Sequence, residues 1–91
     1  MRAELKQNLY HGSATWETAT LNRDLIKSYT SPSGVTSAYK FELYAKSDML
    51  VSINGSNPIL LVEGDELNLD GLIWSVKLLD NTGVFRYIAY L

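Results

Sequence analysis

The fold is decided by one stretch, residues 38–91, which reads AYKFELYAKSDMLVSINGSNPILLVEGDELNLDGLIWSVKLLDNTGVFRYIAYL. Short runs in which apolar and polar residues alternate follow one another, and a turn sequence separates each run from the next. Alternation with a period of two is typical of an antiparallel strand with one buried face. Turns that recur about every 8–12 residues are typical of a β-sandwich or a barrel.

The clearest strand is predicted over residues 35–46, where every second residue is apolar or small. The residues expected to face the core are Ser37, Tyr39, Phe41, Leu43 and Ala45. Ala38, Lys40 and Tyr44 fall on the opposite face, which we expect to face solvent. Aromatic residues such as Tyr and Phe favour strands.

Two turn sequences predict β-hairpins. Asn54-Gly55 supplies two residues that tolerate positive φ, which is the strongest short-range hairpin signal. The sequence DNTG at residues 80–83 predicts a second hairpin, which would pair residues 72–79 with residues 84–91.

The apolar runs between these turns predict the rest of the strand pattern. ILLVE at residues 59–63 is nearly continuous in apolar residues, so we expect it to be buried on both faces. Glu66–Leu69 alternates and is expected to end at Asp70-Gly71. In LIWSVKLL, residues 72–79, the alternation places Leu72 and Trp74 on one face together with Val76 and Leu78.

The first half of the chain carries weaker signals. Residues 13–21 alternate and predict a strand, and Asn22–Asp24 can turn the chain. Residues 25–30 predict a second, weaker strand, and SPSG at residues 31–34 is a loop because Pro and Gly interrupt regular structure. The predicted fold is therefore an all-β antiparallel sandwich of seven or eight short strands over residues 13–91, either jelly-roll-like or immunoglobulin-like.

Residues 1–12 are expected to form an N-terminal arm. Leu5 and Leu9 are spaced i, i+4, which predicts one or two turns of helix, although a helix this short needs to dock on another surface to be stable. Two interpretations stay open for the arm: it packs on a neighbouring subunit, or it is a partly frayed terminus.

Composition excludes several classes of protein. The 91 residues include no cysteine, which excludes disulfides, cysteine-ligated zinc and thiol nucleophiles. Ten acidic and eight basic side chains give a net charge of −2, which offers nucleic acid no broad electrostatic attraction. No signal peptide or membrane-spanning run is recognised, so we expect the protein to be made in a cytoplasm.

The charge is divided unevenly along the chain. Residues 1–46 carry six basic and four acidic side chains, a net +2, whereas residues 47–91 carry two basic and six acidic ones, a net −4. Two interpretations follow: opposite faces of two copies attract each other, or the acidic residues only occupy turns.

The sequence indicates neither catalysis nor a cofactor. His11 is the only histidine, and it has no recognisable nucleophile or metal-ligand partner, so we expect it to be a surface residue. Glu63, Asp65, Glu66 and Asp70 form an acidic cluster, and a calcium site that uses Asp65, Asn68 and Asp70 is an alternative interpretation. The run does not match an EF-hand loop, and turn formation is the simpler interpretation.

Candidate binding residues are the exposed aromatic and arm residues. We take Tyr44 and Tyr90 to face outward, and Tyr is common at protein interfaces because it buries a large ring while keeping a polar tip. The candidate interface consists of Leu5, Leu9, Tyr10, Tyr44 and Tyr90. Exposed aromatic rings, including Trp16, also suit glycans, so a small carbohydrate-binding module stays as the alternative.

The order of YKFELYAKSDMLVSING, PILLVEGDELNLDG and FRYIAYL resembles small all-β accessory proteins of tailed bacteriophages. The resemblance covers residues 38–91 and lies in rhythm rather than in a diagnostic motif. It implies a non-enzymatic virion component that decorates a capsid or sits in a neck or tail. Its partners would be further copies of itself, or a larger shell or tail protein.

Overall fold

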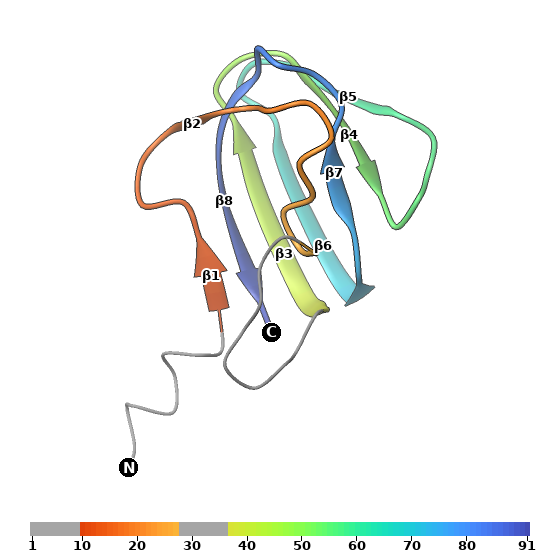
Figure 1. Cartoon of the computed structure of the whole chain (residues 1–91). Helices are drawn as coiled ribbons and strands as arrows, with labels where there is room; N and C mark the ends of the chain where they lie inside the picture. The colour runs from red at the N-terminus through yellow and green to blue at the C-terminus, as the bar shows by residue number, and fades with distance from the viewer. Residues whose placement is uncertain (1–9, 28–36) are drawn as a thin grey trace.

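Eight β-strands form in the part of the chain that the structure, a computed structural model, describes: residues 10–27 and 37–91 (Figure 1). The strands are β1 (Tyr10–Gly12), β2 (Glu17–Thr18), β3 (Ala38–Ala45), β4 (Met49–Ile53), β5 (Ile59–Leu61), β6 (Glu66–Ile73), β7 (Val76–Leu78) and β8 (Val84–Tyr90). Over these described ranges, no helix is long and apolar enough to cross a membrane.

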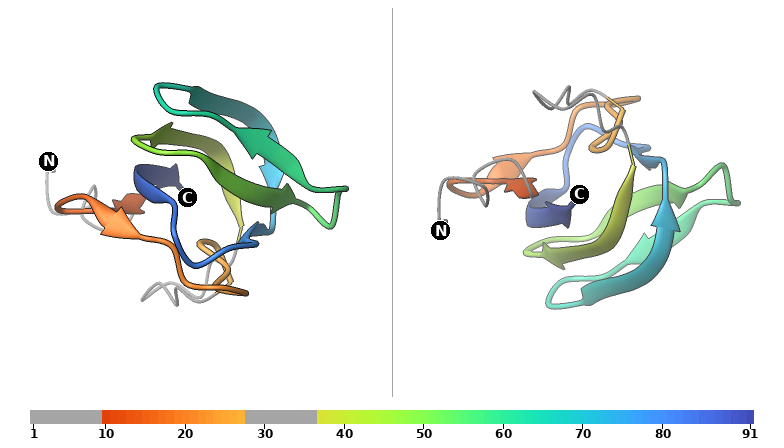
Figure 2. Two further views of the ribbon diagram at one scale, coloured as in Figure 1. Left: turned by 90° about the horizontal axis from the view of Figure 1, so that it is seen from above. Right: turned by 90° about the horizontal axis from the view of Figure 1, so that it is seen from below.

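The strands form two sheets, and every strand pair is antiparallel. The large sheet has the order β1-β8-β3-β6, and β2 adds to it by pairing with β8. The small sheet has the order β5-β4-β7. Figure 2 shows both sheets from above and from below. The predicted fold class, an all-β antiparallel sandwich, is confirmed.

The strands pair in a nested order. β1 pairs with β8, β3 with β6, and β4 with β5, so the chain runs as a long hairpin that is folded over on itself. Residues 22–25 make the remaining nested pair with β7, through an isolated bridge between Asp24 and Lys77. Leu25 N–H donates to the Val76 carbonyl at 2.8 Å in the same pairing.

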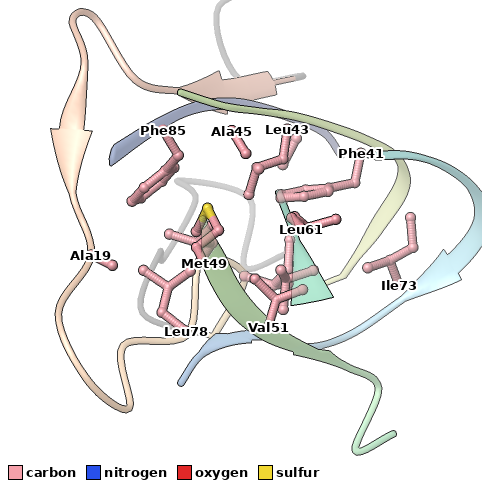
Figure 3. Close-up of a cluster of buried hydrophobic side chains, with 14 of the residues drawn as sticks. Ala19, Phe41, Leu43, Ala45, Met49, Val51, Leu61, Ile73, Leu78 and Phe85 are labelled. Atoms are coloured by element: carbon pink, nitrogen blue, oxygen red, sulfur yellow. The ribbon is translucent and has the colours of Figure 1, made fainter. Parts of the chain in front are cut away.

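Side chains from both sheets fill the space between them (Figure 3). Phe41 and Phe85 from the large sheet are fully buried, as are Met49, Val51 and Leu78 from the small sheet. Burial of an apolar side chain of this size stabilises a fold by about 1.5–3 kcal/mol relative to leaving it exposed. The core therefore holds the two sheets face to face.

The predicted faces of β3 are right from Lys40 onward and wrong at Ala38 and Tyr39. Ala38 is buried and Tyr39 is 59% exposed, the reverse of the prediction. The register with β6 shifts here, because Ala38 pairs with Ile73 whereas Lys40 pairs with Asp70, which leaves one extra residue on β6. Such an irregularity changes which side chains face the core.

The prediction that the run at residues 66–69 ends at Asp70-Gly71 is wrong. β6 continues to Ile73, and Gly71 lies inside it at the register shift. The φ angle of Gly71 is +117°, a backbone conformation that glycine adopts without steric cost. Gly71 therefore allows the strand to carry an extra residue instead of stopping it.

Residues 72–79 do not form one strand. β6 ends at Ile73 in the large sheet and β7 begins at Val76 in the small sheet, so the two residues between them cross from one sheet to the other. Leu72 is 68% exposed and Trp74 is also exposed, whereas Ile73 is buried. The crossing is fixed by Asn54, whose side chain accepts hydrogen bonds from the Trp74 and Ser75 N–H groups at 2.8 and 3.1 Å.

The first predicted hairpin is confirmed, and the second is wrong. Asn54 and Gly55 have φ angles of 51° and 75°, and they join the antiparallel strands β4 and β5. Residues 80–83 do turn the chain, but they join β7 in the small sheet to β8 in the large sheet. The Asp80 carboxylate holds this corner by accepting hydrogen bonds from Gly83 N–H at 3.0 Å and from Leu50 N–H at 2.8 Å.

β5 is an edge strand, so the prediction that residues 59–63 are buried on both faces is wrong. Leu61 is buried, but Leu60 is 60% exposed and Val62 is exposed as well. The small sheet therefore presents aliphatic side chains on the face that points away from the core.

The first half of the chain has less strand than predicted. Of residues 13–21 only Glu17–Thr18 is a strand, and the turn predicted nearby is found, with Arg23 N–H donating to the Thr20 carbonyl at 3.1 Å. Residues 25–27 form a turn rather than a strand, and the rest of that predicted strand lies outside the described residues. Residues 10–12, which we grouped with the arm, form β1, whereas Leu5 and Leu9 lie outside the described residues.

Candidate functional site

The outward face of the large sheet is ordered in three rows that run across the strands. The register places Tyr10, Tyr90, Lys40 and Asp70 in the first row, Gly12, Ile88, Glu42 and Asn68 in the second row, and Arg86, Tyr44 and Glu66 in the third row. Neighbouring rows are two residues apart along each strand, or about 6.5 Å. Aromatic residues occur in the first and third rows, whereas the second row has none.

Tyrosine rings gather around the first row. Tyr90 contacts Tyr10 at a ring-centroid distance of 6.4 Å and Tyr39 at 6.3 Å. The Lys40 ammonium lies 5.4 Å from the Tyr90 ring centroid, within the range of a cation–π contact. Two of these rings, Tyr10 and Tyr39, are exposed, so this end of the face is aromatic and open to solvent.

Trp16 covers the third row. It lies in the connection between β1 and β2, and its ring centroid is 5.7 Å from that of Tyr44. Two cations also approach the indole, with Lys46 Nζ at 4.9 Å and the Arg86 guanidinium at 5.4 Å from the ring centroid. These contacts hold the indole against the sheet, yet 40% of Trp16 stays exposed.

A groove of about 690 Å³ lies over these rows. Tyr10 lines one part of it, and Trp16 and Tyr44 line another. Its charged and amide side chains are Glu42, Glu66, Asn68 and Arg86. Two carboxylates and one guanidinium give this lining a net charge of −1. A groove of this size with aromatic walls and a few polar groups has the usual features of a small-ligand site.

The structure brings three of the five candidate interface residues onto one face. Tyr10 and Tyr44 line the groove, and Tyr90 lies beside Tyr10 in the first row. Tyr10 and Tyr44 are exposed and Tyr90 is half-buried. The sequence marks Trp16 as an aromatic ring suited to glycans, but it does not predict that Trp16 lies over Tyr44, because the connection that carries Trp16 is not a regular strand.

His11 is not a simple surface residue, which corrects the prediction. It is half-buried, its ring packs edge-on against Tyr87 at 5.6 Å, and its Nδ1 lies 3.3 Å from the Tyr87 hydroxyl. Burial lowers the pKa of His11 below its usual value, and the positive charge of Arg23 lowers this pKa further. The imidazole is therefore held in its neutral form at the side of the sandwich.

An ion pair stands close to this histidine. Arg23 Nη1 lies 2.6 Å from Glu17 Oε1, and the Ser13 hydroxyl donates to the other carboxylate oxygen of Glu17. Burial alone would raise the pKa of Glu17, but the hydrogen bonds from Arg23 and Ser13 outweigh it and lower the pKa. Ser13 also accepts a hydrogen bond from the Tyr87 N–H at 3.3 Å, so the pair fastens the β1–β2 connection to β8.

The outward face of the small sheet is aliphatic. Leu50 and Leu60 are direct partners in the register between β4 and β5, and Val62 is exposed two residues beyond Leu60. Leu79 extends the group, since its N–H donates to the Leu50 carbonyl at 2.9 Å. We call Leu50, Leu60, Val62 and Leu79 the aliphatic patch. Sequence reasoning missed it because it placed residues 59–63 in the interior.

Opposite charges stand at the two ends of the aliphatic patch. Asp48 precedes β4, and its carboxylate accepts a hydrogen bond from Glu63 N–H at 2.9 Å, so two exposed acidic residues lie at this end. At the other end Lys77 pairs with Ser52, and Lys77 and Lys27 both line a hollow of about 410 Å³. The small sheet therefore has an acidic end and a basic end.

The residues of the calcium alternative occupy a turn and a strand. The Asp65 carboxylate accepts a hydrogen bond from Val62 N–H at 2.9 Å, and Asn68 and Asp70 lie on β6 opposite Glu42 and Lys40. Over residues 10–27 and 37–91 there is no group of three or more His, Cys, Asp or Glu side chains that could hold a metal ion.

Comparisons with known proteins add no relative: no protein-family model, no curated protein and no solved structure matches the chain.

Proposed function

We propose that this protein is a non-enzymatic structural module that assembles in multiple copies through the aliphatic patch, and that it serves as an accessory component of a tailed-bacteriophage particle. The observation that carries the proposal is the outward pair Leu50 and Leu60, with Leu60 60% exposed. An antiparallel sheet that faces water normally carries polar residues on its outer face. A contiguous aliphatic patch there supports contact with another protein surface.

Charge favours a second copy of this chain as the occupant. When two copies meet face to face around a two-fold axis with their β4 strands antiparallel, the basic end of each meets the acidic end of the other. Lys77 of one copy then faces Glu63 and Asp48 of its partner, twice over. A two-fold interface is self-complementary in this way, and complementary charges fix its register.

The nested strand order supports a jelly-roll topology for the sandwich. Pairs β1–β8, β3–β6 and β4–β5, with residues 22–25 beside β7, follow the order of a jelly roll rather than that of an immunoglobulin domain. Jelly rolls occur in viral capsid proteins, and also in lectins and cupins. The fold is thus compatible with a virion role without establishing it, since one fold hosts many functions.

The assembly is tested by measuring the molar mass of the protein by size-exclusion chromatography with light scattering over a range of concentrations. We expect a mass of at least two chains. Leu60→Lys should shift the mass toward one chain, because it places a charge in the aliphatic patch. The matched control is Tyr39→Lys, since Tyr39 is equally exposed but lies on the large sheet; it should leave the mass unchanged. A single-chain mass at every concentration contradicts the proposal.

The virion role is tested separately. Purified phage particles from a host that carries the gene should contain the protein when their components are identified by mass spectrometry. Its presence in the lysate but not in washed particles would contradict a role in the particle, and would leave the mass measurement to decide on assembly.

A further inference from the structure

We propose that the groove on the outward face of the large sheet binds a neutral oligosaccharide. This inference does not rest on assembly through the small sheet, because the groove and the aliphatic patch lie on opposite outer faces of the sandwich.

The first support is the fixed position of Trp16. A sugar ring presents a flat C–H face, which packs on an aromatic ring that is exposed and held still. Tyr44, Lys46 and Arg86 all contact the indole, and 40% of Trp16 stays exposed. An exposed aromatic ring that is already ordered loses little conformational entropy when a ligand packs on it.

The second support is the spacing of aromatic and polar groups. Tyr10 belongs to the first row and Tyr44 to the third, which places them about 13 Å apart along the strand direction. That span exceeds one hexose ring, so the ligand is an oligosaccharide that reaches from one aromatic end to the other. Between the ends lie Glu42 and Asn68, directly opposite each other in the second row.

The polar side chains that line the groove suit the hydroxyl groups of a sugar. Every sugar hydroxyl both donates and accepts, so a sugar site needs both kinds of partner. A carboxylate such as Glu42 accepts, the Arg86 guanidinium donates, and the Asn68 amide does both. All three line the same groove, and each reaches it from a different strand.

Charge argues for a neutral sugar. Glu42 and Glu66 are offset by Arg86 in the lining and by two lysines beside it, since Lys40 pairs with Glu42 at 3.6 Å and Lys46 lies over Trp16. The charges around the groove therefore nearly balance and give a phosphate backbone or an acidic polysaccharide no net attraction. A protein occupant is disfavoured because the middle row offers one aliphatic side chain, Ile88, where protein interfaces have an apolar centre.

The test uses the fluorescence of Trp16. The chain has two tryptophans, and Trp74 lies outside the groove lining, so Trp74→Phe leaves Trp16 as the single reporter. This protein is titrated with cellohexaose, chitohexaose, xylohexaose, laminarihexaose and mannohexaose up to roughly 10 mM, which detects a Kd of about 1 mM. We expect at least one of them to shift the Trp16 emission in a saturable way.

Substitutions inside and outside the groove localise the effect. Asn68→Ala removes hydrogen bonds to the sugar without touching Trp16, and should weaken binding about tenfold. Leu60→Ala, on the aliphatic patch, should leave the affinity unchanged. The proposal would be overturned if binding survived when Asn68→Ala and Tyr10→Ala are combined in one chain. It would also be overturned if Leu60→Ala weakened the affinity as much as Asn68→Ala does, or if none of the five hexasaccharides gave a saturable change. A change in molar mass on substituting Tyr10 would instead identify the groove as a protein interface and would equally overturn it.

Discussion

Leu50 and Leu60 face each other across β4 and β5 on the side of the small sheet that points away from the core. On the other side of the same two strands, Met49, Val51 and Leu61 are buried between the sheets. Both faces of this strand pair are therefore apolar, and among residues 10–27 and 37–91 the core covers only the inner face.

Asp24 is predicted to be a main determinant of stability. Its carboxylate is buried and accepts hydrogen bonds from Ile26 N–H and Lys27 N–H at 3.0 Å and from the Ser75 hydroxyl. Asp24→Ala leaves these donors without their acceptor, and should lower the free energy of unfolding by about 2–4 kcal/mol. Urea unfolding measures this loss. The control Asp70→Ala, at an exposed position, should change it by less than about 0.5 kcal/mol; equal effects would contradict the role of Asp24.

Stability should fall in two steps as the pH is lowered. Burial and the charge of Arg23 lower the pKa of His11 below 6.5 in the folded chain, so the unfolded chain takes up this proton first. The stability that neutral His11 contributes is complete above pH 6.5 and is lost as the pH falls toward the folded pKa. His11→Gln should remove this upper step from the dependence of the unfolding free energy on pH.

The lower step comes from carboxylates. Burial alone would raise the pKa of Asp24, but hydrogen bonds from Lys27, Ser75, Ile26 and Val76 outweigh it and lower the pKa below 3.8. The stability from ionised Asp24 is present above 3.8 and is lost as the pH falls through the folded pKa. This step should persist in His11→Gln. An unchanged upper step in that variant would show that another group titrates there.

Gly12 is predicted to tolerate no side chain. A Cβ at this position would lie 2.2 Å from the Tyr87 carbonyl oxygen, so β1 would have to move away from β8. Gly12→Ala should cost about 1–3 kcal/mol and speed hydrogen exchange of the β1 and β8 amides. Gly55→Ala is the control, because a Cβ there meets open space and the cost, about 1 kcal/mol, comes from the φ of +75°. Unchanged exchange in β1 with Gly12→Ala would refute the close approach.

Asn54 is predicted to act through its side chain as well as through its backbone. Its amide nitrogen donates to the Leu72 carbonyl at 3.0 Å and its oxygen accepts from Trp74 N–H at 2.8 Å, so the hairpin turn holds the crossing between the sheets. Asn54→Gly keeps the positive φ and removes all three side-chain hydrogen bonds, including the one from Ser75 N–H. It should lower the free energy of unfolding by about 1–2 kcal/mol, as thermal or urea unfolding would record. If Asn54→Gly left the free energy of unfolding unchanged, only the backbone conformation of Asn54 would matter for stability.

The fold class and the first hairpin could be predicted from the sequence because each depends on residues that are close together in the chain. Alternation from Phe41 to Ala45 and the positive φ of Asn54 and Gly55 each depend on a few adjacent residues. The prediction of the second hairpin is wrong because DNTG specifies a turn but not which sheets the turn connects. Its destination depends on contacts with distant residues, such as Leu50 N–H on Asp80.

The candidate site was predictable in part for the same reason. The outward direction of Tyr44 follows from alternation, and the structure agrees. The faces of Ala38 and Tyr39 were inverted because an extra residue on the partner strand β6 shifts the register there. The aliphatic patch was missed because a run such as ILLV looks the same whether the core or a partner subunit covers it. Only its place on the edge strand β5 distinguishes the two.

The central claim, two-fold assembly through the small sheet, is tested most directly by exchanging charges across the proposed interface. Sedimentation velocity of Lys77→Glu and of Glu63→Lys should each show a dimer weakened about tenfold, because like charges then face each other in both symmetry-related contacts. The double variant, which carries both substitutions in one chain, should regain the dimer of the unsubstituted protein. A dimer that neither single substitution weakens, or a double variant no stronger than the single ones, would contradict the account.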